Sequence, residues 1–164
     1  MSAPDAAPLT ATVVCASNRA AAGIYEDTTG PLIVEALREL GFDVEGPVVV
    51  ADGEPVGAAI AAAVADGRRL VVTTGGTGLT PTDRTPEVTR ALLDREVPGI
   101  AEAVRAYGVA QGVPTAALSR GLAGVAGQTL VVNLPGSRGG VKDGLEVLRP
   151  LVVHACEQIV GSDH

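Results

Sequence analysis

Residues 73–87 read TTGGTGLTPTDRTPE and are the most informative stretch of the sequence. They follow an apolar strand pattern and precede a helical one, so a polar loop opens where an α/β sheet binds ligands. Gly75, Gly76 and Gly78 lack a Cβ, so backbone N–H groups there can approach a bulky anion. We call residues 75–84 the glycine loop and expect it to hold phosphate beside a divalent metal.

Two common phosphate motifs do not describe this loop. It lacks the Gly-Lys-Ser/Thr ending of the P-loop. Gly76-Thr77-Gly78 is not followed by a third glycine two residues later, so the dinucleotide-binding fingerprint also fails. A long Gly/Thr/Pro turn without chemistry is the alternative interpretation. Loops so rich in special residues are uncommon in short domains, which favours a functional loop.

Apolar runs and helical spacing alternate along the rest of the chain. Strands are expected at residues 11–16, 44–51, 69–74 and 129–134. Helices are expected at about residues 29–40, 54–65, 85–93, 100–110 and 140–160. Alternating strands and helices predict an α/β fold: a three-layer α/β/α domain with a mostly parallel sheet. We expect a single domain of ordinary length over residues 9–164, after a disordered tail at residues 1–8.

Several local signals set the expected helix ends. Thr28 or Thr29 could cap the first helix, and Thr85 could cap the helix after the glycine loop. Pro150 should bend or break the last helix. The apolar stripe of that helix could serve the core or an interface: Val141, Leu145, Leu148, Val152, Ala155 and Ile159. Cys15 and Cys156 are expected to be small buried hydrophobes.

The parallel topology predicts which loops meet. The carboxyl ends of parallel strands share one edge of a sheet, and ligands bind beyond that edge. Four polar segments follow the four expected strands: Ser17-Asn18-Arg19, Asp52-Gly53-Glu54, the glycine loop and Pro135-Gly136-Ser137. We therefore expect these segments to converge on one site.

Asp52 and Asp83 are the expected catalytic and metal-binding carboxylates. They belong to adjacent strand-end loops and could jointly hold Mg²⁺, a cation that prefers oxygen ligands and substrate phosphates. The alternative for Asp52 is a helix N-cap. Ser137 could cap the last helix or bind a phosphate at that helix N-terminus. Asp27 could belong to a ligand site or to a solvated turn.

Composition narrows the expected partners. The formal net charge is −7 and aromatic residues make up 2% of the chain, which argues against nucleic acid and anionic membranes as partners. Arg19, Arg84 and Arg138 could supply the local positive charge that an anionic substrate needs. The sequence shows neither a signal peptide pattern nor an apolar run of transmembrane length, so a cytoplasmic protein is expected.

These residues together resemble the molybdenum-cofactor biosynthesis family, whose members bind molybdopterin. The similarity is greatest to the small, single-domain molybdopterin adenylyltransferases and extends from about Thr12 to Ile159. The motifs that carry it are Ser17-x-Arg19 with Gly23 and Glu26-Asp27, Thr74–Gly78 with Asp83-x-Thr85-Pro86-Glu87, Ser119-Arg120 with Ala123-Gly124, and Asn133-Leu134-Pro135-Gly136-Ser137.

The resemblance implies a reaction and a set of contacts. Molybdopterin and ATP would give adenylylated molybdopterin and pyrophosphate, with Mg²⁺ required and with Asp52 and Asp83 at the acidic positions. A homotrimer, or a hexamer, and hand-over to a molybdate-insertion enzyme are also implied. The residues placed in substrate or nucleotide contact are Ser17, Arg19, Asp27, Thr74, Gly75, Gly76, Thr77, Gly78, Thr85, Asn133, Pro135, Gly136 and Ser137.

Two positions depart from the family pattern. Asn18 stands where the family usually has an aspartate, and Arg138 stands where a proline usually follows Pro-Gly-Ser. A catalytically silent molybdopterin-binding paralogue is therefore the alternative function. The later metal-insertion enzyme carries additional domains, for which we expect no room in 164 residues.

Overall fold

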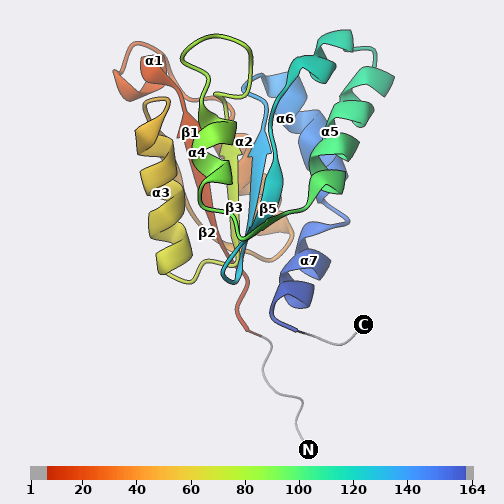
Figure 1. The fold of residues 1–164 in the computed structure, drawn as a ribbon. Coiled ribbons are helices and arrows are strands. Elements are labelled where there is room, and N and C mark those ends of the chain that lie inside the picture. The colour runs from red at the N-terminus through yellow and green to blue at the C-terminus, as the bar shows by residue number, and fades with distance from the viewer. Residues whose placement is uncertain (1–6, 162–164) are drawn as a thin grey trace, which may run out of the picture.

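The computed structural model describes residues 7–161 as one sheet between two layers of helices (Figure 1). The six strands lie in the order β2-β1-β3-β6-β5-β4. Strand β1 is parallel to β2 and β3, and β3 is parallel to β6, whereas β5 is antiparallel to β6 and β4. The strands are Thr10–Ala16 (β1), Asp43–Val50 (β2), Leu70–Thr74 (β3), Arg95–Glu96 (β4), Ala123–Ala126 (β5) and Thr129–Leu134 (β6). The predicted three-layer fold with a mostly parallel sheet is confirmed.

Helices cover both faces of this sheet. One face packs against α2, α5, α6 and α7, and the other packs against α3 and α4 (Figure 1). The helices are Asn18–Ala21 (α1), Gly30–Glu39 (α2), Glu54–Ala65 (α3), Thr85–Arg90 (α4), Pro98–Ala110 (α5), Arg138–Leu148 (α6) and Val152–Ile159 (α7), with a 3-10 turn η1 at Pro114–Leu118.

The central strands are buried along their whole length. Every residue of β3 and β6 is buried, which explains why both read as continuous apolar runs rather than alternating ones. Covering a valine or leucine side chain fully stabilises the fold by about 1.5–3 kcal/mol. This rigid centre fixes the positions of the loops that leave it.

The connections create a crevice beside β1. The chain leaves β1 through α2 to reach β2 on one side, and then crosses through α3 to reach β3 on the other side. Loops from β1 and β3 therefore diverge at the carboxyl edge, which is where open α/β sheets bind ligands. The glycine loop and α1 both lie at this end of the sheet (Figure 1).

Several details differ from the sequence prediction. The short strands β4 and β5 and helix α1 were not predicted. The expected cap Thr85 is instead the first residue of α4, with Arg84 at the cap position and no side-chain cap bond. Thr29 occupies the cap position of α2 without a side-chain cap bond of its own.

The expectations for Pro150 and for the two cysteines are confirmed. Pro150 lies in the break between α6 and α7, and most of the apolar stripe there belongs to the core. Both cysteines are buried. Residues 1–6 of the expected tail lie outside the described part of the chain. Within residues 7–161, every helix is too short or too polar to cross a bilayer.

Candidate functional site

A polar cavity of about 360 Å³ lies beyond the carboxyl ends of β1 and β3. Segments that follow β1, β2, β3 and β6 all contribute to its walls. Of the predicted site residues, those lining it are Ser17, Arg19, Asp27, Asp52, Thr74, Gly75, Gly76, Asp83 and Gly136. The structure therefore brings together both carboxylates and parts of all four expected loops.

The glycine loop begins with two glycines, and a side chain added at either one would displace neighbouring atoms. Gly75 has φ 92°, and a Cβ there would lie 2.3 Å from the Ala16 carbonyl oxygen. Gly76 has φ 68°, and a Cβ there would lie 2.2 Å from Thr85 Oγ1 and 3.0 Å from Asp52 Oδ1. Gly75 thus lets the loop pack against β1, and Gly76 lets the loop backbone pack closely against Thr85 Oγ1 and Asp52 Oδ1.

Those two oxygens are unsatisfied. Among the residues that the structure describes, Asp52 Oδ1 and Thr85 Oγ1 are buried and have no hydrogen-bond partner. Buried polar atoms are normally paired, so an orphaned pair requires an explanation. The N-cap alternative for Asp52 does not provide one, because Gly53 occupies the cap position of α3 and no side chain caps that helix.

The surroundings of Asp52 also disfavour its charged form. Its pKa is raised above the ordinary value of 3.8, first by burial and then by the negative charge of Asp83, and the Asn18 backbone only partly offsets this. A cation between the two carboxylates would relieve both effects.

Asp83 is held in place by its own loop. Its Oδ2 accepts a hydrogen bond from Thr80 N at 3.0 Å, and its backbone N–H donates to Thr80 O at 3.0 Å. Within residues 7–161, no group of three or more His, Cys, Asp or Glu side chains is placed to hold a metal ion. Asp52 and Asp83 alone nevertheless fit Mg²⁺, which is commonly bound by one or two carboxylates together with substrate phosphates.

Asn18 supports Asp52. Its side-chain Oδ1 accepts a hydrogen bond from the Asp52 backbone N–H at 2.9 Å. A carboxylate at position 18 would make the same contact, so the departure from the family pattern preserves this bond and removes a negative charge near Asp52. Asn18 itself lines the cavity.

The wall formed by β1 and the start of α2 is a connected polar cluster. Asp27 Oδ1 accepts from the backbone N–H groups of Thr29 at 3.1 Å and Gly30 at 3.0 Å, so Asp27 takes the capping role expected of Thr28 or Thr29. Thr74 Oγ1 donates to Pro135 O at 2.8 Å. Cys15 lines the cavity too, and burial, followed by the charge of Asp27, raises the pKa of its thiol to about 12. Cys15 is therefore a protonated wall residue at neutral pH.

Six predicted site residues lie outside the wall of this cavity. Asn133 is buried, with Nδ2 donating to Thr73 Oγ1 at 2.9 Å and Thr89 Oγ1 at 3.1 Å, and with Oδ1 accepting from Leu122 N at 3.2 Å. Its role in the structure is to join β6 to its neighbours. The others are Thr77, Gly78, Thr85, Pro135 and Ser137.

Pro135 and Ser137 line a second, less polar cavity of about 190 Å³. Ser137 Oγ accepts from Gly140 N at 3.0 Å, so it caps α6 and at the same time faces this cavity. Gly136 between them lines the first cavity. The Pro-Gly-Ser turn therefore separates the two cavities.

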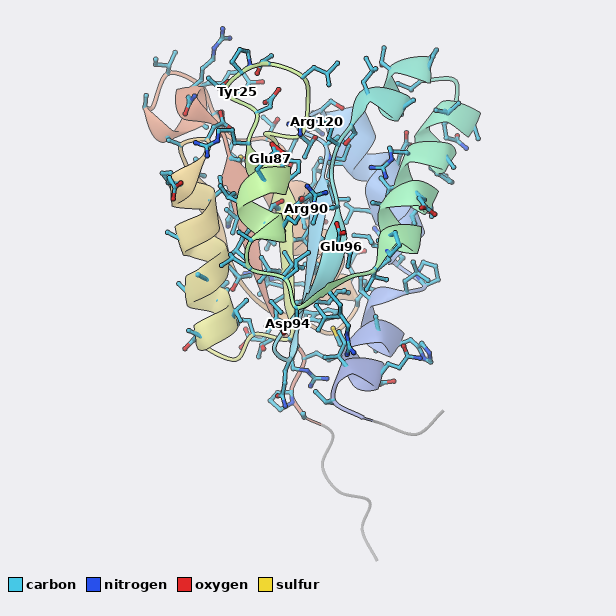
Figure 2. The ribbon with its side chains drawn as sticks, in the orientation of Figure 1. Tyr25, Glu87, Arg90, Asp94, Glu96 and Arg120 are labelled. Atoms are coloured by element: carbon cyan, nitrogen blue, oxygen red, sulfur yellow. The ribbon has the colours of Figure 1, made fainter. Side chains whose placement is uncertain are left out.

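Of the three arginines expected to capture an anion, Arg19 lines the larger cavity. Arg84 and Arg138 are exposed and do not line it. Sequence reasoning also missed Tyr25, which lines the cavity at its mouth and is 58% exposed. Figure 2 shows Tyr25 at the same end of the sheet as Glu87 and Arg120, with Asp94 at the other end.

This arrangement defines an α/β domain with a polar cavity at the carboxyl edge of its sheet. The family model described as "Probable molybdopterin binding domain" matches residues 12–154. The chain therefore belongs to this molybdopterin-binding family of molybdenum cofactor biosynthesis.

Individual relatives agree with that assignment. The molybdenum cofactor biosynthesis bifunctional protein of Synechococcus elongatus is 43% identical over 170 residues, which span 99% of this chain and 53% of that protein. This chain thus spans about half the length of that curated relative. The molybdopterin adenylyltransferase of Helicobacter pylori strain J99 is 37% identical over 157 residues, 92% of this chain and 87% of that protein. Among solved structures, the molybdopterin biosynthesis Mog protein from Mycobacterium ulcerans has a TM-score of 0.90 at 52% identity, covering 96% of this chain and 100% of that one.

Proposed function

We propose that this chain is a molybdopterin adenylyltransferase, which transfers AMP from ATP to molybdopterin and releases pyrophosphate. The observation that carries the proposal is the meeting of Asp52 and Asp83 in one cavity, with Asp52 Oδ1 and Thr85 Oγ1 left unpartnered in front of Gly76. Relatives named molybdopterin adenylyltransferase support the same reaction.

In this reaction an oxygen of the molybdopterin phosphate forms a bond to the α-phosphorus of ATP, and the bond from that phosphorus to the bridging oxygen breaks. Asp52 and Asp83 would hold Mg²⁺, which when bound offsets the negative charge of the α-phosphate and of the departing pyrophosphate. The backbone around Gly75 and Gly76 would lie against the phosphates, and Arg19 would add positive charge to the wall.

The two cavities suggest how the substrates divide. The larger cavity carries the carboxylates and suits the triphosphate, whereas the smaller and more apolar one beside Ser137 suits a ring system. The Pro-Gly-Ser turn between them would then lie beside the reacting phosphates. A cytoplasmic homotrimer or hexamer that hands its product to a molybdate-insertion enzyme completes the proposal.

Pyrophosphate release from ATP and molybdopterin, with and without Mg²⁺, tests this function. We expect release that depends on molybdopterin and on Mg²⁺. Asp52→Ala should shift the Mg²⁺ titration to higher concentration, because one of two carboxylate ligands is removed. Capture of the anionic substrates should also weaken with added salt.

The alternative, a silent molybdopterin-binding paralogue, is supported by Asn18 at the position where the family usually has an acid. Such a protein would take up molybdopterin without releasing pyrophosphate from ATP. That result, obtained with folded protein and saturating Mg²⁺, would refute the transferase proposal.

A further inference from the structure

Arg120 has a conspicuous set of bonds for an arginine outside the cavity wall. It lies between η1 and β5, about forty residues after the glycine loop in the sequence. Its Nε donates to Gly78 O at 2.9 Å, and its Nη2 donates to Asp83 O at 2.8 Å. Both bonds end on the glycine loop, one near each end of the turn that presents Asp83.

Two further contacts fix Arg120 itself. Nη1 donates to both carboxylate oxygens of Glu87, at 2.8 and 3.1 Å. The Arg120 backbone N–H donates to Thr77 O at 2.8 Å. All three guanidinium nitrogens are therefore bonded, which needs the planar fork of arginine and could not be reproduced by a lysine ammonium. Figure 2 shows Arg120 and Glu87 directed toward one another beside α4.

The loop segment that Arg120 holds is otherwise short of support. Thr80, Pro81 and Thr82 are exposed, and Leu79 is 66% exposed. Its internal bonds join Thr80 to Asp83 and do not tie the turn to the rest of the domain. The Asp83 carboxylate nevertheless has to reach the cavity that holds Asp52.

We propose that Arg120, seated on Glu87, is a positioning residue that fixes the glycine loop and so sets where the Asp83 carboxylate lies relative to Asp52. The inference rests on the proposed function in that Asp83 is taken as a metal ligand. Arg120 does not line the larger cavity, and it acts through the loop alone.

Stability alone would not reveal this role. An ion pair whose partners are 37% and 44% exposed stabilises a fold only slightly. A misplaced catalytic group, in contrast, can cost up to about 100-fold in rate. The distinguishing measurements are therefore loop protection and metal dependence, not the melting temperature.

The test compares Arg120→Gln with Arg149→Gln. Arg149 is a matched control, because its side chain is also 37% exposed and also bonds a glutamate, Glu39, at 3.1 Å. It directly follows α6, and its partner lies on α2 instead of beside the glycine loop. In Arg120→Gln, amide hydrogen exchange of residues 78–84 should be faster by about tenfold, the scale expected when charge-assisted hydrogen bonds are lost. Arg149→Gln should leave that exchange unchanged.

Pyrophosphate release gives the functional readout. In Arg120→Gln, kcat should fall by about 10–100-fold and the Mg²⁺ titration should shift to higher concentration, with the KM for molybdopterin unchanged. Arg120→Lys should behave in the same way, since it keeps the charge but loses the fork. Loop exchange and a Mg²⁺ titration equal to those of Arg149→Gln would overturn the proposal.

Two provisions keep the outcome decisive. If the Arg120 variants do not fold, Glu87→Gln replaces them, and unchanged exchange at residues 78–84 in that variant would overturn the proposal. Hydrogen exchange does not depend on adenylyl transfer. A wild-type protein that releases no pyrophosphate therefore counts against the proposed function, while the loop measurement still decides the role of Arg120.

Discussion

Thr85 and Thr89 lie one turn apart on α4, and both are completely buried. Their hydroxyl groups differ in hydrogen bonding. Thr89 Oγ1 accepts a hydrogen bond from Asn133 Nδ2. Within the described residues, Thr85 Oγ1 has no hydrogen-bond partner, and it faces Gly76 near Asp52.

The difference separates two kinds of buried polar cluster. The cluster of Thr73, Thr89 and Asn133 uses each polar group of the Asn133 amide within the protein, as a structural network should. In the cluster of Asp52 and Thr85, one oxygen of each side chain has no partner among the described residues, and Asp52 lines the larger cavity. Unsatisfied buried oxygens cost stability unless something binds to them, so this second cluster is the better candidate for a ligand site.

The largest effect should come from removing the charge of Asp83, which lines the same cavity as Asp52. Asp83→Asn keeps an oxygen that can accept from Thr80 N, so the loop should retain its shape. Loss of the negative charge should slow pyrophosphate release by about 10²–10³-fold, with little change in molybdopterin affinity. Steady-state kinetics and a binding titration would check this, and turnover close to that of the wild type would remove Asp83 from the mechanism.

A change in the cluster of Thr73, Thr89 and Asn133 should instead lower the free energy of unfolding. Asn133→Leu has a similar volume but leaves Leu122 N and two threonine hydroxyls without their partner. At about 1–3 kcal/mol for each of these three buried groups, the free energy of unfolding should fall by at least about 3 kcal/mol. Urea denaturation measures it. A loss below about 0.5 kcal/mol would mean that the network is not structural.

A matched pair of smaller changes compares the two threonines directly. Thr89→Val should lower the free energy of unfolding by about 1 kcal/mol, the net value of one hydrogen bond. Thr85→Val removes a hydroxyl that is unpartnered in the described chain, so the apo protein should lose no stability. Equal destabilisation of both variants would contradict the contrast between the clusters.

The smallest effect is a pH dependence that belongs to Asp52. Because its folded pKa is raised by burial and by Asp83, folding binds protons between the ordinary value of 3.8 and the raised one. The contribution of Asp52 to stability is therefore present at low pH and is lost as pH rises through that window. Asp52→Asn should accordingly gain in stability over the wild type as pH rises from about 4 to 7.

Thermal denaturation across pH, in the absence of divalent cations, measures that difference. Glu54→Gln is a suitable control, since Glu54 is an exposed acid two positions further along the chain. If the difference in melting temperature between Asp52→Asn and the wild type stayed constant with pH, as for the control, the folded state would not raise the pKa of Asp52.

The sequence predicted what local patterning determines. Strands β1, β3 and β6 are mostly apolar runs, and β2 ends in one, Val48–Val50. The parallel topology then fixes which loops meet. Strands β4 and β5 were missed because β4 has two charged residues and β5 reads as AGVA. Gly124 in β5 is required by its partner, since a Cβ there would lie 2.5 Å from Arg95 O, and no local signal reveals that contact.

For the site, the sequence likewise predicted which loops meet but not the contacts between their residues. Asp52 and Asp83 could be placed in one cavity from strand order, but their surroundings could not. The bond from Asp52 N to Asn18 joins residues 34 positions apart, and those of Arg120 to the glycine loop span 37 to 42 positions. The family resemblance implied that Asn133 contacts substrate, and only the packing of β6 shows that its amide is already engaged.

The turn at residues 135–137 borders both cavities, since Gly136 lines the larger one and Pro135 and Ser137 line the smaller one. A Cβ at Gly136 would lie 3.2 Å from Gly75 Cα. Any side chain added here would therefore press on the backbone of the glycine loop, which lines the larger cavity. Gly136 thus limits how closely the chain after β6 can approach the chain after β3, and its replacement should widen the distance between these two walls.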